Sequence, residues 1–245
     1  MRLPAMSGVI DRRILANYRV DPDYMANVLP PPFRPQVYDG VSIGGICLIR
    51  LTHVRPKMLP GNWGIRSENA AHRFAVEWDS ETGIRQGVYI PRRDTNSRLN
   101  AWAGGRIFPG VHHHASFTVD ESATNLSVSM KSEDGNADVY VSGQLADHLP
   151  DDSVFDSLSS ASLFFEKDDL GYSDTQTAGR FDGLKLQCQD WKVYPLDVVS
   201  VHSNYFDNTS IFPLGTATFD NALFMRDITH EWHGQPDLCC AVDKA

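Results

Sequence analysis

Lysine, cysteine and long apolar segments are scarce in this chain, and each shortage excludes a class of protein. The four cysteines have neither the paired spacing of a zinc ribbon nor the density of a secreted disulfide scaffold. No apolar run approaches the roughly 20 residues that span a bilayer. The first residues also lack the apolar core of a signal peptide. We therefore expect a cytoplasmic protein that has no membrane partner.

Positive charge is also in deficit. The formal net charge is -9 and the pI is about 5.4, so the overall field repels nucleic acid and anionic membranes. Any anion binding must then depend on a local group of arginines. The 245 residues are 42% hydrophobic, and no linker, repeat or low-complexity tract divides them. We expect a single domain over residues 1–245.

Short runs of β-branched and aromatic residues, separated by turn residues, predict a chain built mainly from strands. The run 41–54 is apolar throughout, and Gly44 and Gly45 within it indicate a bulge or a close backbone approach. Strands are expected at 14–20, 41–54, 70–79, 84–92, 111–119, 126–132, 137–144, 183–203 and 222–233.

Two segments depart from the strand pattern. Residues 21–29 predict a helix that begins at Asp21 and Pro22 and ends at the triple proline. Apolar residues recur at helical spacing from Val154 to Phe165, behind a cap at Asp152 or Ser153. Residues 165–175 are expected to form a helix end followed by a loop. The fold class is therefore mainly β (α+β), a barrel or closed sandwich with two or three short helices.

The segment 85–118 concentrates the chemistry, because it holds five arginines and three consecutive histidines between predicted strands. A guanidinium stays charged at working pH, and its planar fork of donors matches a carboxylate. The segment therefore predicts a pocket for a small anion. The alternative is that these arginines pair across strands with Glu68, Glu77 or Asp94.

Strand alternation predicts that His112 and His114 share one face and that His113 lies on the other. Together with His230 and His233 these side chains could ligate a metal, but their spacing matches no specific zinc signature. Packing or hydrogen bonding within the barrel is the simpler interpretation, so we expect neither metal nor cofactor. No GxSxG elbow is present, which argues against a serine nucleophile.

Several segments together resemble the acetoacetate-decarboxylase-like superfamily. The opening DRRILANYRVDPDYMANVLPPPFRP is similar to its entry motif of an arginine, a strand, a helix and prolines. SENAAHRFAVEW, GVYIPRRDTNSRLNAWAGG, FPGVHHHASF and LFFEKDDLGYS resemble its uncharacterised YqjF-like branch. The resemblance spans nearly the whole chain. It implies a large, cone-like antiparallel β-barrel around a pocket.

In the decarboxylase, an arginine, a glutamate and a lysine pair line that pocket, and the reactive lysine forms a Schiff base. By motif position, Arg12 resembles the arginine and Glu68 resembles the glutamate. The lysine region reads TNSRLNAWAGG here and carries Arg98 without a lysine. A guanidinium with a pKa above about 12 cannot form an imine. We therefore expect no Schiff-base chemistry; Lys57 is the one lysine whose sequence context leaves a pocket role open.

The resemblance implies a site in which Glu68 acts as the acid or base, while Arg12 and Arg98 clamp an anion. Further substrate-binding residues are expected at Arg93, Asn96, Asn100, His112, His114 and Tyr172. The first functional class is a lyase, isomerase or hydrolase that acts on a small carboxylate or oxo acid. The second is a barrel that binds such a molecule without turning it over. Unpaired edge strands could also drive homo-oligomerisation.

Overall fold

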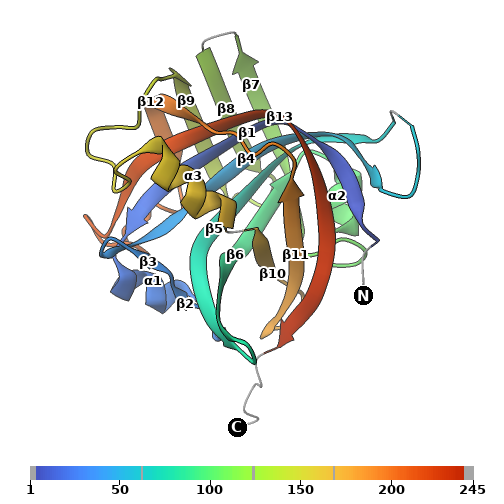
Figure 1. Ribbon diagram of the computed structural model, residues 1–245, viewed down its shortest axis with the longest axis horizontal. Helices are drawn as coiled ribbons and strands as arrows, with labels where there is room; N and C mark the ends of the chain where they lie inside the picture. Colours follow the sequence, from blue (N-terminus) through green and yellow to red (C-terminus); the bar gives the residue numbers. More distant parts are fainter. Residues whose placement is uncertain (1–3, 62, 123–124, 168, 240–245) are drawn as a thin grey trace.

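The structure is a computed structural model that describes residues 4–61, 63–122, 125–167 and 169–239 (Figure 1). In these ranges, thirteen strands form one mixed sheet accompanied by three helices. The strands are β1 (Met6–Val20), β2 (Arg34–Pro35), β3 (Val37–Tyr38), β4 (Val41–Pro56), β5 (Ile65–Ser80), β6 (Gly83–Thr95), β7 (His112–Glu121), β8 (Asn125–Ser132), β9 (Asp138–Leu145), β10 (Leu170–Asp174), β11 (Arg180–Cys188), β12 (Tyr194–Ser203) and β13 (Ala217–Cys239). The helices are α1 (Pro22–Val28), α2 (Arg98–Ala103) and α3 (Leu158–Lys167).

In the described chain, strand pairing closes the sheet into two rings that share five strands. One edge of β6 pairs with β5, whereas the other pairs with β10 at residues 88–90 and with β7 at residues 93–95. β13 forks in the same way between β12 and β11. In the described chain, β13, β1, β4, β5 and β6 are therefore shared by two rings. A nine-stranded ring closes through β7, β8, β9 and β12, and a seven-stranded ring closes through β10 and β11.

The predicted closed, mainly β architecture is confirmed, with one difference in strand direction. β6 runs parallel to both β7 and β10, where only antiparallel pairs were expected. The connection from β6 to β7 spans residues 96–111 and carries α2, so it is long enough to return the chain to the same end of the sheet. A tight hairpin turn cannot do this, because it reverses the chain direction.

Alternation along β1 divides the core between the two rings. Ile14, Ala16 and Tyr18 belong to the large apolar cluster of the nine-stranded ring. Leu15 belongs to a second cluster, which also contains Phe165 of α3. Because successive strand residues point to opposite faces, the shared strands form a partition whose two faces carry different side chains.

The first predicted helix is confirmed as α1. The Asp21 carboxylate accepts the backbone N–H of Asp23 at 2.9 Å, and Pro22 occupies the first turn. The second helix begins later than predicted, at Leu158. Ser153 and the N–H of Val154 donate to buried Asp220 at 2.8 and 2.9 Å, and this anchor holds residues 153–154 outside the helix.

Two other sequence predictions were wrong in detail. The predicted loop at 165–175 contains β10, whose residues 170–173 are buried between β6 and β11. The single strand predicted at 183–203 is two strands, because Asp190 has a positive φ of 55° and the chain leaves β11 there. Neither feature has a strong local signal: β10 is short, and its register is set by neighbours that are distant in sequence.

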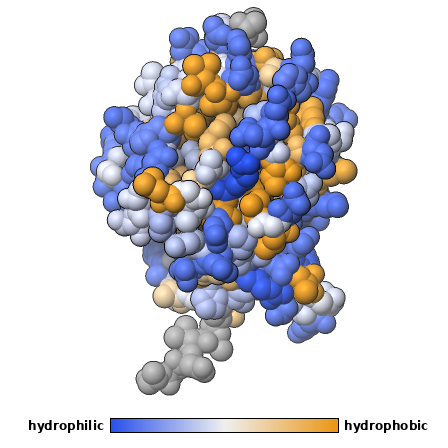
Figure 2. All heavy atoms as spheres, turned by 90° about the vertical axis from the view of Figure 1, so that its left-hand side faces the viewer, coloured by the Kyte–Doolittle hydropathy of each residue, from blue (hydrophilic) through white to orange (hydrophobic). Residues whose placement is uncertain are grey.

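The surface is mixed in character. Figure 2 shows hydrophilic side chains over much of one face, with hydrophobic ones gathered between them. Exposed apolar side chains include Leu214 and Val199, which are 92% and 78% exposed. Across the described ranges, no helix has the length and apolar character needed to cross a membrane.

Candidate ligand-binding site

The seven-stranded ring surrounds a cavity of about 340 Å³, to which each of its strands contributes side chains or backbone. Most of the wall is apolar, including Leu15, Ile49, Leu51, Ile90, Leu186 and Trp232. α2 and the residues that follow it cover one end. A mostly apolar cavity with a few polar groups is the usual form of a small-molecule site.

Arg93 is the central polar group of this cavity. It lies where β6 changes partner from β10 to β7, and its Nε donates to Ser173 Oγ at 2.9 Å. Within the described ranges, no carboxylate forms an ion pair with its guanidinium. Burial lowers the pKa of Arg93 to about 10, although Cys47 and Asp182 act in the opposite direction. The cavity therefore holds a charge that is poorly compensated by the protein.

A glycine allows the chain to approach Arg93 closely. Gly110 has a φ of +79°, in the left-handed region that favours glycine. A Cβ at this position would lie 3.2 Å from Arg93 Nε and 2.6 Å from Ser173 Cβ. Gly110 therefore permits the packing that holds Ser173 against the guanidinium.

His112 lies beside Arg93 on the neighbouring strand. Its Nδ1 is 2.9 Å from the carbonyl oxygen of Gly110, which can only accept a hydrogen bond. Nδ1 therefore carries the proton, and Nε2 is left as an acceptor. Burial and, secondarily, Arg93 lower the pKa of His112 to about 3, so the imidazole is neutral at pH 7.

Two further arginines line the same cavity, and the sequence interpretation missed both. Arg13 donates from Nε to Cys47 Sγ at 3.3 Å, and its guanidinium lies 5.9 Å from the ring of Trp191. Arg73 donates from Nη2 to Asn17 Oδ1 at 2.5 Å and lies 4.9 Å from the Phe165 ring. Arg13 could have been found from the sequence, because alternation along β1 places it on the face opposite Arg12.

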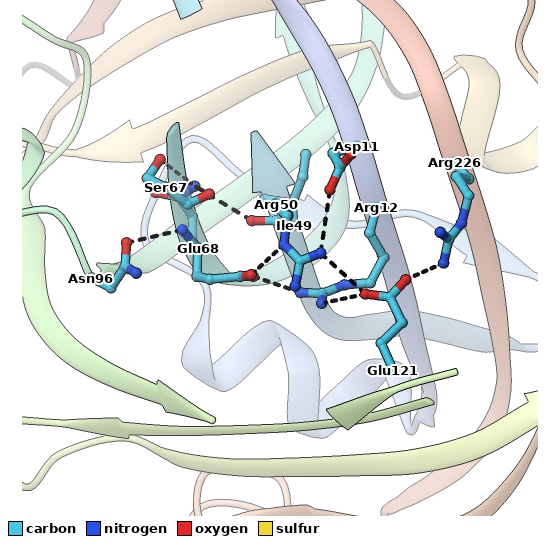
Figure 3. A network of polar contacts seen from close by, with 10 residues as sticks. Asp11, Arg12, Ile49, Arg50, Ser67, Glu68, Asn96, Glu121 and Arg226 are labelled. Atoms are coloured by element: carbon cyan, nitrogen blue, oxygen red, sulfur yellow. Dashed lines mark hydrogen bonds and ion pairs between the residues drawn. The ribbon is translucent and has the colours of Figure 1, made fainter. Parts of the chain in front are cut away.

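Glu68 and Arg12 lie on the other face of the partition (Figure 3). Arg12 Nη2 is 2.6 Å from Glu68 Oε2, and Arg50 Nε is 2.5 Å from Glu68 Oε1. Burial lowers the pKa of Arg12, and the charge of Glu68 opposes this effect. Ser67 and Asn69, the residues on either side of Glu68, line the cavity, whereas Glu68 and Arg12 do not.

Three acids and three arginines make up the polar network around this pair: Asp11, Glu68, Glu121, Arg12, Arg50 and Arg226. Figure 3 shows Glu121 between Arg226 on one side and the other two arginines on the other. The network is balanced in formal charge, in contrast to the cavity. Balanced buried networks stabilise one arrangement of side chains when their hydrogen bonds are satisfied.

The other predicted site residues are divided between the cavity and its surroundings. Asn100 lines the cavity, and its Nδ2 lies 3.3 Å from Ser67 Oγ. Arg98 is exposed on α2 and does not line the cavity. Asn96 is exposed, and its Oδ1 accepts the backbone N–H of Glu68 at 2.9 Å.

His114 and Tyr172 also lie outside the cavity wall. His114 makes an ion-pair contact of 2.8 Å from Nδ1 to Glu133. Tyr172 of β10 is buried against Phe33 and Trp78, on the side of its strand away from the cavity, and burial raises its pKa. The structure thus brings Arg93, Asn100 and His112 together at one cavity.

Pairing with an acid, the alternative weighed for the arginines of segment 85–118, occurs at Arg92, but its partner Asp94 lies at 2.9 Å on the same strand rather than across strands. Glu77 pairs at 2.8 Å with Arg34, which lies outside that segment. Lys57 forms an ion pair with Glu231 at 2.7 Å. None of the lysines in the described ranges lines the cavity, and Lys244 lies outside those ranges. In the part of the chain that is described, no three potential metal ligands gather in one place.

Comparison with known families agrees with the predicted architecture. The model of DUF2071, described as an uncharacterized conserved protein, matches residues 10–223. The chain belongs to the DUF2071 family. The comparison of this DUF2071 protein with curated proteins found no match.

Solved structures show the same fold at low sequence identity. Acetoacetate decarboxylase from Legionella pneumophila aligns with a TM-score of 0.64 and 12% identity, covering 99% of this chain and 90% of that one. An acetoacetate decarboxylase-like enzyme from Sphingomonas wittichii RW1 aligns at 0.57 and 9% identity, covering 97% and 92%. The enduracididine biosynthesis enzyme MppR, complexed with the condensation product of pyruvate and imidazole 4-carboxaldehyde, aligns at 0.55 and 10%, covering 96% and 88%. The resemblance found in the sequence is thus confirmed at the level of fold.

Proposed function

We propose that this DUF2071 protein is an enzyme that binds a small carboxylate or oxo acid in the cavity of the seven-stranded ring. The observation that carries the proposal is Arg93, a half-buried cation that has no ion-pair partner among the described residues and lines a cavity of about 340 Å³. A carboxylate would form charge-assisted hydrogen bonds with its two terminal nitrogens. The pyruvate-bound structure of MppR, which has the same fold, supports an oxo acid as the ligand.

Arg93 would bind the carboxylate, while Asn100 and His112 would orient the remainder of the molecule. As negative charge develops on an enolate or carboxylate oxygen, a guanidinium fixed nearby stabilises it. Once a bound anion offsets Arg93, one of the three causes that lower the pKa of His112 is weakened. Nε2 of His112 then becomes a better proton acceptor, which suits a lyase or isomerase step without a Schiff-base lysine.

The catalytic roles predicted for Glu68, Arg12 and Arg98 are retained as hypotheses. Glu68 is flanked on β5 by the cavity residues Ser67 and Asn69, and Arg12 of β1 contacts Glu68. Arg98 lies next to Leu99, a cavity residue on α2, and could attract anions toward the site. Direct contacts from Asn96, His114 and Tyr172 to the ligand remain predictions with less support, because none of these residues lines the cavity.

Binding without turnover is the second candidate function. The observation that favours it is the apolar character of the wall, since a binding protein needs only one charged contact to orient its ligand.

A cytoplasmic location and self-association through strand edges also belong to the proposal. Sedimentation of the purified protein would test self-association.

Thermal unfolding with a panel of carboxylic and oxo acids tests the proposal. A ligand at about 100 times its dissociation constant adds roughly 2.7 kcal/mol, which raises the midpoint by about 5 to 10 °C in a domain of this size. We expect this shift in the wild type and its loss in Arg93→Met; its loss in Arg98→Ala as well would support the anion clamp predicted for Arg98. Turnover assays with the acids that bind then separate the enzyme from the binding protein. An absence of any shift in the wild type would overturn the proposal.

A further inference from the structure

The cavity is larger than a three- or four-carbon acid requires. Its volume is about 340 Å³, and an apolar cavity of about 150 Å³ is sufficient to hold benzene. Roughly two six-carbon groups therefore fit in the available space. A ligand the size of pyruvate would leave most of the apolar wall without a contact.

Charge and apolar surface are separated along the cavity. Arg93 pairs in register with Ala71 of β5, whereas Ile65 lines the cavity six residues earlier on the same strand. At about 3.3 Å per residue, these two positions are about 20 Å apart. Around Ile65 the wall is apolar, with Met6, Val54 and Trp232 from the neighbouring strands.

The apolar end is also where the cavity meets solvent. Leu99, Trp102 and Ile107 line the cavity and are nevertheless 56%, 58% and 54% exposed. Ile65 is 36% exposed. Exposed apolar side chains that continue into a cavity are typical of a ligand-binding groove, because a ligand tail removes them from water.

Arg13 is the charged group along the wall between the two ends, where the polar side chains of Ser67 and Asn69 also line the cavity. Its guanidinium is held by Cys47, Met225 and the ring of Trp191. A sulfur atom is a weak acceptor, so a second carboxylate at this position is the main alternative to an apolar ligand body.

We propose that the ligand is an amphipathic carboxylate, with its acid group on Arg93 and an apolar body of about ten to twelve carbons that extends to the mouth at α2. This inference rests on the proposed function, because it assumes that an acid occupies the cavity. It specifies the class of acid, which the proposed function leaves open. The apolar body is a linear, branched or aromatic hydrocarbon chain.

Calorimetry with an acid series tests the inference: butanoate, hexanoate, octanoate, decanoate, dodecanoate and tetradecanoate, each below its aggregation concentration. We expect the affinity to rise about fourfold for each added methylene, because each buried CH₂ contributes about 0.8 kcal/mol. The rise should end near ten to twelve carbons, when the cavity is full. Decanamide, which lacks the charge, should bind at least tenfold more weakly than decanoate.

Two tryptophans give a matched pair of variants for the mouth. Trp102 and Trp63 are 58% and 54% exposed, but only Trp102 lines the cavity. Trp102→Ala should weaken decanoate binding about tenfold and leave butanoate binding unchanged. Trp63→Ala should change neither, and both variants should fold, because their side chains are largely outside the core.

The outcomes separate this inference from the proposed function. Equal affinity from butanoate to decanoate, with binding lost in Arg93→Met, would overturn the amphipathic ligand and leave the carboxylate site in place. Sebacate binding tenfold more tightly than decanoate would also overturn it and assign Arg13 to a second carboxylate. If no acid binds, both proposals fail. Because the comparison of decanoate with decanamide uses the wild type, the test does not depend on the folding of Arg93→Met.

Discussion

Arg12 Nη2 lies 2.6 Å from Glu68 Oε2, and the Arg12 side chain is 1% exposed. This pair is on one face of the partition, and the cavity with Arg93 is on the other. The buried guanidinium of Arg12 is thus matched by an acid, whereas that of Arg93 has no ion pair in the described chain. We therefore expect an anionic ligand to bind at Arg93 rather than at Arg12, because the charge of Arg12 is already compensated by an acid.

Removing the charge of Glu68 should destabilise the fold. In Glu68→Gln, Arg12 and Arg50 lose their nearest acid while Arg12 stays buried, and breaking one side of a buried pair costs about 3–5 kcal/mol. Urea unfolding would measure this loss. Asp79→Asn is the control, since its exposed pair with Arg34 should leave the unfolding midpoint almost unchanged.

The same variant tests catalysis. If Glu68→Gln remains folded and binds the acid with wild-type affinity but loses turnover, Glu68 has the acid–base role that the resemblance implies. Wild-type turnover per folded molecule would limit Glu68 to structural support of Arg12.

His72 should make stability depend on pH. Burial lowers its pKa to about 4 from the ordinary value of 6.5, and it is 1% exposed. Between these two pH values the unfolded chain binds an extra proton, so stability is lost as the pH falls from 6.5 toward 4. His72→Phe should reduce the slope of unfolding free energy against pH by about 1.4 kcal/mol per pH unit near pH 5. An unchanged slope between pH 5 and 6 would contradict the buried neutral imidazole.

Gly110→Ala should disturb both stability and ligand binding. The new Cβ would lie 2.6 Å from Ser173 Cβ, and overpacking of this kind costs about 1–3 kcal/mol. Gly135→Ala is the matched control, because Gly135 has a similar φ of +73° and no atom within 4 Å of its added Cβ. The control should show only the backbone strain of about 1 kcal/mol. Equal unfolding midpoints for the two variants would mean that the region around Arg93 can adapt.

Tyr172→Phe should leave ligand binding unchanged. The hydroxyl lies 3.4 Å from the Pro236 carbonyl oxygen, and the ring packs away from the cavity. Loss of one long hydrogen bond should cost no more than about 1 kcal/mol. A tenfold loss of acid affinity, measured by calorimetry, would instead support the direct contact predicted from the sequence.

Some features of this protein were predictable because their causes are local. The carboxylate of Asp21 and the ring of Pro22 start α1 within a few residues, and the apolar run at 41–54 becomes β4. The start of α3 was mispredicted, because Ser153 and Val154 bind Asp220, which is far away in sequence. β10 was missed for the same reason: five residues become a strand when two neighbours supply its hydrogen bonds.

The candidate site also combines features with local causes and features that depend on residues far apart in the sequence. The sequence by itself determined the mainly β class, the family resemblance and the concentration of arginine around residues 92–106, because these depend on composition, periodicity and motif order. Only the tertiary structure decided which arginines are compensated. The forks at β6 and β13 create two rings from shared strands, and adjacent residues such as Arg12 and Arg13 therefore face different interiors. The sequence shows that these two side chains point to opposite faces of β1. Only the pairing of distant strands shows which ring each face encloses.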